Sequence, residues 1–569
     1  MSATHSPVSI PYTTLTEALA AAPEAQPFVT MWSDDDDERT FSFGEFKRWS
    51  NSQAALFRSY GLEKGDTVIL IMPQGVALMA AFAGAMLLGA VPAILAYPTF
   101  KVEPAKYRFG LKGVTANLNA KLVVVDDSFP DQILESVSLG GQSKLIRISG
   151  VPPATEDVAA PQFHCHQDDL AFIQHSAGTT GLQKGVALSH GAVLRQLAHL
   201  GDRLKIQSSD RIYSWLPLYH DMGLIACFIL PMVYHLHLVM QSPTDWVMQP
   251  QSMVHLISRY KCTLSWIPNF TLQFLARRVK LQDRKECNLS SLRALINCSE
   301  PVRAESLDEF AGAFLSCGLQ PTAVQSSYAM AENVFAVTQS EISSDPRRVW
   351  IDASKYQMER IAVSVEPDSD SALCFVSSGK CLPGNEVRIV SESGEALADG
   401  HVGEILIRSD SMLDGYYNRP ELTALSLRDG WYRSGDLGFL LDEELYVTGR
   451  KKDLIIVGGK NIYPQDLEEI ACGHPSIHDG RAVAFGWYNP DLGTEDIVIV
   501  AEIENTADLE DSSAIERAVR TSIVEELGVA PRVIYLKPPR WIIKSTAGKP
   551  ARSATREKLL AEHPELRIS

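Results

Sequence analysis

The stretch Ser176-Ala-Gly-Thr-Thr-Gly-Leu-Gln-Lys-Gly-Val186 brings together glycines, hydroxyls and a lysine shortly after an apolar run at 170–173. Glycine lets a backbone approach an oxyanion closely, and hydroxyl and backbone N–H groups then donate hydrogen bonds to it. The stretch therefore predicts a phosphate-binding loop, with a nucleoside triphosphate as the leading ligand. A Walker loop requires G-x-x-x-x-G-K-[ST], but here Lys184 is followed by Gly185, so the register does not fit.

Around this loop, short apolar runs alternate with helical or loop segments. The runs lie at 68–71, 90–95, 122–125, 211–216 and 264–267. This alternation predicts doubly wound α/β layers.

The pattern changes near residue 375, where short β-rich pieces are separated by glycines and acidic turn residues. After Arg450 the pattern becomes α+β. The expected strands lie at 385–390, 403–408, 444–448, 481–485 and 496–503, and a helix is expected at 513–527.

These patterns predict an α/β protein with two domains. A large N-terminal domain of doubly wound sheets is expected at 1–450, with a small β subdomain at about 375–450. A small α+β domain is expected at 451–569. The three cations of Gly449-Arg-Lys-Lys-Asp453 favour an exposed hinge between the two domains.

The 569 residues include 52 basic and 69 acidic side chains, giving a formal net charge of −17. Such a field repels polyanions, which argues against general binding to nucleic acid or anionic membranes. Nine cysteines without a CxxC pair indicate reduced thiols, and no export signal is apparent, so we expect a cytoplasmic protein. Gly89 and Pro92 divide the uncharged stretch 76–96, so no stable membrane insertion is expected.

Further motifs follow the loop in a fixed order. They are Trp215-Leu-Pro-Leu-Tyr-His-Asp-Met-Gly-Leu224, Ile267-Pro-Asn-Phe270, Asn297-Cys-Ser-Glu-Pro301, Tyr328-Ala-Met-Ala-Glu332, Tyr432-Arg-Ser-Gly-Asp-Leu-Gly438, Gly449-Arg-Lys-Lys-Asp453 and Gly548-Lys549. The series resembles the acyl-activating adenylate-forming superfamily, which includes acyl-CoA synthetases, nonribosomal adenylation domains and luciferases. The Trp215 motif, the Pro-Asn-Phe270 segment and Asn461-Ile-Tyr-Pro-Gln-Asp466 are most similar to the fatty acyl-AMP ligase branch.

The resemblance implies a ligase that uses ATP and Mg²⁺. It would activate a hydrophobic carboxylic acid to an acyl adenylate, release pyrophosphate, and pass the acyl group to the phosphopantetheine thiol of a carrier protein. The physical problem is charge, because a carboxylate attacks an α-phosphate that is itself anionic.

The opening loop is then expected to hold the β- and γ-phosphates. Glu332 is the expected Mg²⁺ ligand, assisted by Thr180, because this hard cation prefers oxygen donors. The expected phosphate-binding residues are Ser176, Gly178, Thr179, Thr180, Gly181 and Lys184.

The resemblance also assigns the nucleoside. Tyr328 offers an aromatic face to adenine, and Asp436 offers acceptor oxygens to the two ribose hydroxyls. Arg450 adds positive charge beside the ribose and α-phosphate. The remaining adenine-pocket residues are expected to be Ser299, Glu300, Pro301 and Ala329, the last of which stands where the family usually has glycine.

Lys549 is the expected catalytic residue, bridging the substrate carboxylate and the α-phosphate where charge develops. Glu332 and Arg450 are the other expected catalytic charges. Lys452 occupies the hinge position, about which the C-terminal domain of the resembling enzymes swings after adenylation.

His220 is expected to gate or line the acyl pocket. Ordinary core packing is a rival explanation for the apolar and aromatic members of this set. The other expected pocket residues are Met222, Trp266, Asn269 and Phe270.

The acceptor is the least determined part of the prediction. In the resembling ligases an extra segment disfavours coenzyme A, and residues 349–373 are long enough to be its counterpart. An acyl-CoA synthetase that uses the same adenylate is the alternative. A nonenzymatic adenylate-binding protein is less favoured, because only catalysis requires Glu332, Asp436, Arg450 and Lys549 together.

Overall fold

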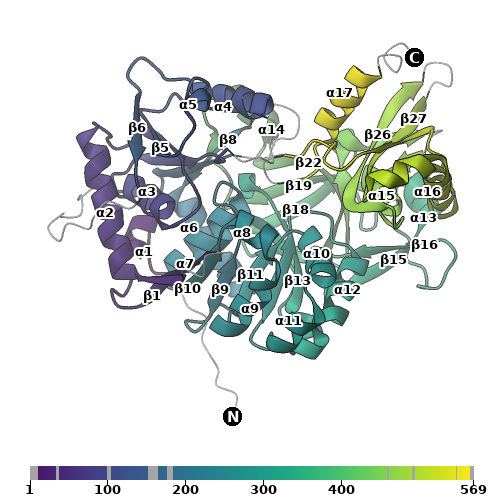
Figure 1. Ribbon diagram of the computed structural model, residues 1–569, viewed down its shortest axis with the longest axis horizontal. Coiled ribbons are helices and arrows are strands. Elements are labelled where there is room, and N and C mark those ends of the chain that lie inside the picture. Colours follow the sequence, from purple (N-terminus) through teal and green to yellow (C-terminus); the bar gives the residue numbers. More distant parts are fainter. Residues whose placement is uncertain are drawn as a thin grey trace.

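The chain is built around one large mixed sheet. The computed structural model describes residues 10–33, 38–98, 104–150, 164–175, 183–457, 460–489, 494–545 and 548–563. In Figure 1 the purple and teal segments form the left and centre of the molecule, and the yellow-green C-terminal segment lies at the upper right.

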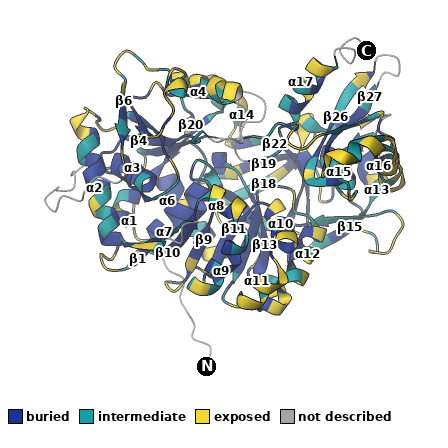
Figure 2. Cartoon of the chain, in the orientation of Figure 1, coloured by how far each residue is buried: buried dark blue, intermediate teal, exposed yellow. Residues whose placement is uncertain are grey.

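One side of the large sheet is parallel. Its strands follow the order β13-β12-β11-β9-β10-β1 and are almost entirely buried, as expected of parallel strands covered on both faces. The central strands are accordingly dark blue in Figure 2, whereas the outer helix faces are yellow. The bounds are β1 (Pro27–Trp32), β9 (Arg211–Ser214), β10 (His237–Gln241), β11 (Leu264–Ile267), β12 (Ala294–Cys298) and β13 (Val324–Ala329).

The other side of the sheet is antiparallel. The expected β subdomain at about 375–450 is not a sheet of its own, because its strands continue the large sheet from β14 in the order β17-β23-β22-β19-β18. The bounds are β14 (Ala336–Gln339), β17 (Lys380–Cys381), β18 (Asn385–Val390), β19 (Gly403–Ser409), β22 (Trp431–Leu441) and β23 (Glu444–Arg450).

A second, parallel sheet has the strand order β4-β3-β5-β6. The uncharged stretch 76–96 divides as predicted into a buried helix, α3 (Val76–Leu87), and the strand β4. None of the helices in the described ranges is long and apolar enough to cross a membrane. The strand bounds are β3 (Thr67–Ile71), β4 (Val91–Ile94), β5 (Leu122–Asp126) and β6 (Lys144–Ile148).

The N-terminal segment contains a hairpin. β2 (Glu38–Ser42) pairs antiparallel with β1, and the helix α2 (Phe43–Ser59) begins at a capping box in which Ser42 and Glu45 bond reciprocally. The acidic tip at 34–37 lies outside the described residues.

The segment after Arg450 forms its own small unit. Its antiparallel pair β26–β27 is extended by β28, and two hydrophobic clusters lie wholly between residues 455 and 559. The bounds are β24 (Ile455–Val457), β25 (Lys460–Ile462), α15 (Pro464–Cys472), β26 (Ile477–Asn489), β27 (Thr494–Ile503), α16 (Ser512–Leu527), β28 (Val533–Lys537) and α17 (Arg552–Glu562).

Candidate active site

The predicted phosphate loop connects two antiparallel strands. β7 (Leu170–His175) and β8 (Gly185–Ser189) pair with each other, and β20 (Gly415–Tyr416) pairs with β8. The five expected loop residues Ser176, Gly178, Thr179, Thr180 and Gly181 lie outside the described residues. Their roles therefore stay predictions.

Lys184 marks where the loop rejoins the described chain. Its Nζ lies 4.6 Å from the centroid of the Tyr416 ring, a cation–π distance. The Tyr416 hydroxyl donates to Glu332 Oε1 at 2.8 Å and lies 3.0 Å from the Tyr432 hydroxyl. Tyr416 therefore connects the end of the loop to Glu332, a link that the motif analysis missed.

Glu332 has the surroundings of a cation ligand. It is 9% exposed, and no basic side chain among the described residues forms an ion pair with it. Burial and the negative charge of Glu332 raise the pKa of Tyr416, so the phenol stays protonated and donates to the carboxylate. A buried carboxylate that lacks a basic partner fits a hard divalent cation.

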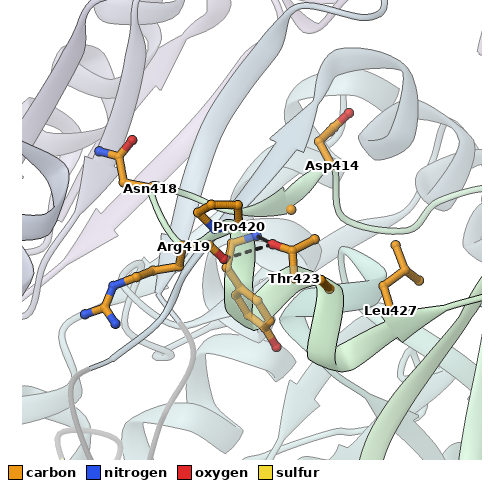
Figure 3. A pocket seen from close by; sticks show the side chains of 9 residues that line it. Asp414, Asn418, Arg419, Pro420, Thr423 and Leu427 are labelled. Carbon is orange, nitrogen blue, oxygen red and sulfur yellow. Dashed lines mark hydrogen bonds between the residues drawn. The ribbon is translucent and has the colours of Figure 1, made fainter.

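A cavity of about 540 Å³ lies beside β20 and the start of α14 (Pro420–Ser426). Figure 3 shows Asn418, Arg419 and Thr423 around it, with the hydrogen bonds of Thr423 dashed. The Thr423 hydroxyl accepts from the Tyr416 N–H at 2.9 Å and so fixes the backbone of β20. None of the predicted site residues lines this cavity.

Three of the expected nucleoside residues come together through their side chains, although they lie on β13, β22 and β23 of the large sheet. The Tyr328 hydroxyl donates to Asp436 Oδ2 at 2.6 Å, and Arg450 Nε lies 3.3 Å from Asp436 Oδ1. Asp436 and Arg450 are opposite each other in the β22–β23 ladder, so strand pairing brings this cation and carboxylate together. Burial raises the pKa of Asp436, although Arg450 and the Tyr328 hydroxyl act against this rise.

Ser299, Glu300 and Pro301 directly follow β12. Ser299 has a φ of 71°, a left-handed conformation that is uncommon for a residue with a side chain. Its carbonyl oxygen accepts a hydrogen bond from Lys549 Nζ. The backbone turn thus presents an acceptor to the predicted catalytic lysine, which comes from the C-terminal unit.

Asp221 is a further charged residue at this point, and it was not among the predicted site residues. His220 Nδ1 lies 2.6 Å from Asp221 Oδ1, which also accepts the Met222 N–H at 2.7 Å. Burial alone would raise the pKa of Asp221, but His220, the Met222 N–H and Lys549 together hold it below its ordinary value. The signal in the sequence was an acid next to His220 in a largely apolar motif.

The Trp215 motif also requires its glycine. A Cβ on Gly223 would lie 2.2 Å from the Pro217 carbonyl oxygen, so a larger residue would clash with the backbone. The π-helix at Met222–Ile229 therefore packs directly on the preceding turn.

The remaining predicted pocket residues differ in their surroundings. Trp266 is fully buried in β11. The Asn269 amide donates to Ser306 Oγ at 3.0 Å, and its carbonyl accepts from Asn297 at 2.7 Å, so Asn269 anchors the backbone around the adenine segment. Phe270 is 40% exposed, and its N–H donates to Glu300 Oε2 at 3.0 Å.

Two stacked indoles lie beneath Phe270. The Trp215 and Trp246 rings are 3.8 Å apart and nearly parallel, and the Phe270 ring meets both edge-on at about 6 Å. This side of the site is apolar.

Arg450, Lys451 and Lys452 are exposed, whereas Asp453 is half-buried. Lys451 Nζ forms a 3.1 Å ion pair with Glu404, and desolvation lowers the pKa of Lys452. The short 3-10 turn at Lys451–Asp453 leads directly into β24.

A model of the AMP-binding enzyme family matches residues 15–417. The medium-chain-fatty-acid–[acyl-carrier-protein] ligase JamA of Moorena producens is 30% identical over 88% of this chain and 86% of its own length.

Solved structures agree with the sequence match. One structure from studies of fatty acyl-adenylate ligases of E. coli and L. pneumophila superposes with a TM-score of 0.89 at 30% identity, covering 98% of this chain and all of the other. A fatty acyl-adenylate ligase from L. pneumophila, solved in complex with acyl adenylate and pyrophosphate, has a TM-score of 0.72 at 26% identity and covers 98% of both chains.

Proposed function

Because the chain belongs to the AMP-binding enzyme family, we propose that it is an acyl-AMP ligase. It joins a hydrophobic carboxylic acid to AMP from ATP, releases pyrophosphate, and then passes the acyl group to the phosphopantetheine thiol of a carrier protein. The observation that carries this proposal is the contact between Lys549 of the C-terminal unit and the Ser299 carbonyl of the N-terminal unit.

In the first step the acid's carboxylate oxygen attacks the α-phosphorus, and the bond to the bridging oxygen of pyrophosphate breaks. Both reactants are anionic, so positive charge at the junction lowers the barrier. Lys549 supplies a mobile ammonium there, and Arg450 supplies a fixed guanidinium.

The nucleoside is held by groups that the sheet fixes in place. Asp436 accepts hydrogen bonds from the ribose hydroxyls, and Tyr328 presents its ring to adenine. Glu332, with Thr180, would hold Mg²⁺, which supplies charge neutralisation on the phosphates. Lys184 adds positive charge at the end of the phosphate loop.

The acid is proposed to lie on the apolar side of the site. The stacked indoles, with Phe270 above them, favour an alkyl or aryl acid over a free amino acid.

A carrier protein is the favoured acceptor because of where segment 349–373 packs. Within it, α13 (Ala353–Glu359) presents Tyr356, whose ring stacks on Tyr463 of the C-terminal unit at 5.2 Å. Asn461 donates to the Gln357 carbonyl at 2.9 Å and accepts from Arg360 at 2.8 Å. Such contacts restrain the C-terminal unit, which supports the carrier-protein branch over a CoA synthetase.

We place the domain boundary at Arg450/Lys451, with Lys452 in the hinge. The separate hydrophobic clusters of the C-terminal unit support this division. Rotation there would withdraw Lys549 after adenylation and open the site to a thiol.

The direct test is product analysis with the purified chain, ATP·Mg²⁺ and a panel of alkyl, aryl and amino acids. We expect acid-dependent ATP–pyrophosphate exchange with hydrophobic acids and mass-spectrometric detection of the acyl adenylate. CoA and a holo carrier protein are then offered in parallel. Acyl attachment to the carrier alone supports the proposal, and a CoA ester alone selects the synthetase. Nucleotide binding without exchange for any acid would contradict both.

A further inference from the structure

Arg303 lies at the boundary between the two units. It follows the adenine segment and precedes α12 (Ala304–Phe314), and its N–H donates to Asn269 Oδ1 at 3.3 Å. Its guanidinium forms an ion pair with Glu469 and lies 3.6 Å from Asp466. Both carboxylates belong to α15 in the C-terminal unit, so the pairs cross the interface.

Arg303 and Asp466 are largely withdrawn from water, with 25% and 15% of their side chains exposed, whereas Glu469 is 39% exposed. Removing one partner of such a pair is costly because it leaves the other charge buried without compensation. The contact therefore favours the docked arrangement only while the cation and the carboxylates meet.

α15 is in turn fastened to the segment that carries the catalytic lysine. Arg552, the first residue of α17, bonds Glu468 through Nε at 2.7 Å and through Nη2 at 2.6 Å, and bonds Asp453 at 2.8 Å. Lys549 lies just before Arg552 in the chain. The backbone of this segment is also fixed, because the Ala551 N–H donates to the Ile543 carbonyl at 2.8 Å.

The contacts form a closed ring. It runs from Ser299 along the chain to Arg303, across to α15, through Arg552 to Lys549, and back to the Ser299 carbonyl. We propose that Arg303 is a positioning residue: it latches α15 to the nucleotide side, holds Lys549 in place for adenylation, and must release α15 before acyl transfer. This inference rests on the proposed function.

A second cross-interface pair lies near the rim. Arg277 binds Glu309 through two nitrogens and reaches Asp479 of β26 at 2.8 Å. Arg277 and Asp479 are 49% and 39% exposed, so water and salt screen this pair. It contributes less than Arg303, and the N-terminal unit supplies the cation in both cases.

The test measures adenylation and acyl transfer separately in the variant Arg303→Met. This substitution keeps an apolar side chain and removes the positive charge. At about pH 8, where free carboxylates are ionised, we expect acid-dependent pyrophosphate exchange to fall about tenfold or more. Transfer from a supplied acyl adenylate to a holo carrier should stay at or above the wild-type rate. Equal losses in both half-reactions, or no loss in exchange, would overturn the proposal.

Arg348→Met is the matched control. Arg348 forms a two-point ion pair with Asp308 on α12, but both residues belong to the N-terminal unit. Arg348→Met should leave the ratio of the transfer rate to the exchange rate unchanged. If Arg303→Met does not fold, Arg303→Gln removes the same positive charge and keeps a polar side chain, and it should shift the ratio in the same direction.

Limited trypsin digestion tests the latch without relying on activity. The junction cations Arg450 to Lys452 are exposed cleavage sites. We expect faster cleavage there in Arg303→Met than in wild type or Arg348→Met, and equal rates would count against the latch. Wild-type enzyme without exchange for any acid would refute the proposed function, while the digestion would still decide on the latch.

Discussion

The two sides of the site are held in different ways. Asp436 and Arg450 face each other on adjacent strands, and Tyr328 reaches Asp436 from a third strand, so the ladder of the large sheet fixes these groups. Lys549 comes from the small unit, and its ammonium group donates a hydrogen bond to the backbone carbonyl of Ser299. The fold therefore fixes the positions of Tyr328, Asp436 and Arg450, whereas the position of Lys549 depends on docking of the C-terminal unit.

This difference separates binding from chemistry. Residues on the fixed side should matter whenever a nucleotide is bound, in both half-reactions. Residues on the docked side should matter only while the C-terminal unit is in place. Substitutions that remove one charge from each side test whether the two sides differ in this way.

The largest effect is expected for Lys549→Ala. Acid-dependent pyrophosphate exchange should fall on the order of 10²–10³-fold, because the ammonium is removed where charge develops. ATP affinity, measured by calorimetry, should change little, and transfer from a supplied acyl adenylate should persist. Undiminished exchange would refute the assignment of Lys549.

A smaller but broader effect is expected for Asp436→Asn. The amide keeps the shape but loses the charge that faces Arg450 and accepts from the ribose hydroxyls, so nucleotide affinity should fall about tenfold. Exchange at subsaturating ATP and transfer at subsaturating acyl adenylate should both decline. Loss in exchange alone would place Asp436 with the docked side instead.

The smallest effect is a pH dependence of docking. Burial raises the pKa of Glu469 to about 7. Arg303 itself acts in the opposite direction. The carboxylates that add to the rise are Glu305, Asp466 and Glu526.

The sign of this dependence follows from the raised pKa. The docked unit holds a proton that the undocked unit releases near the ordinary pKa of 4.5, so docking is strongest below that pH and weakens as pH rises through about 7. We expect the ratio of transfer to exchange to rise about two- to threefold between about pH 6 and pH 8. Glu469→Gln cannot titrate and should flatten this rise, and an unchanged slope would contradict the assignment.

Much of the fold could be predicted from local patterns. The alternation of apolar runs predicted β3, β5, β9 and β11. The pairing of strands was not predictable in the same way. The β-rich region after residue 375 reads as separate because nothing local indicates that β17 joins β14.

The candidate site, too, could be predicted only in part. Motif order predicted Tyr328, Asp436 and Lys549, and the structure places the first two in contact and the third at Ser299. Tyr416 and Arg303 were missed because each acts through a partner far away in the chain. No spacing rule connects Tyr416 to Glu332, or Arg303 to α15.

The change from parallel to antiparallel strands at β13 has a consequence for protein engineering. The strands that flank the apolar side of the site, β9, β11 and β12, belong to the parallel half, whereas Asp436 and Arg450 belong to the antiparallel half. Exchanging the segments that follow β9 and β11 between related chains would therefore change which acid is selected and leave Asp436 and Arg450 in place. The boundary between the parallel and antiparallel halves is β13, the strand that carries Tyr328.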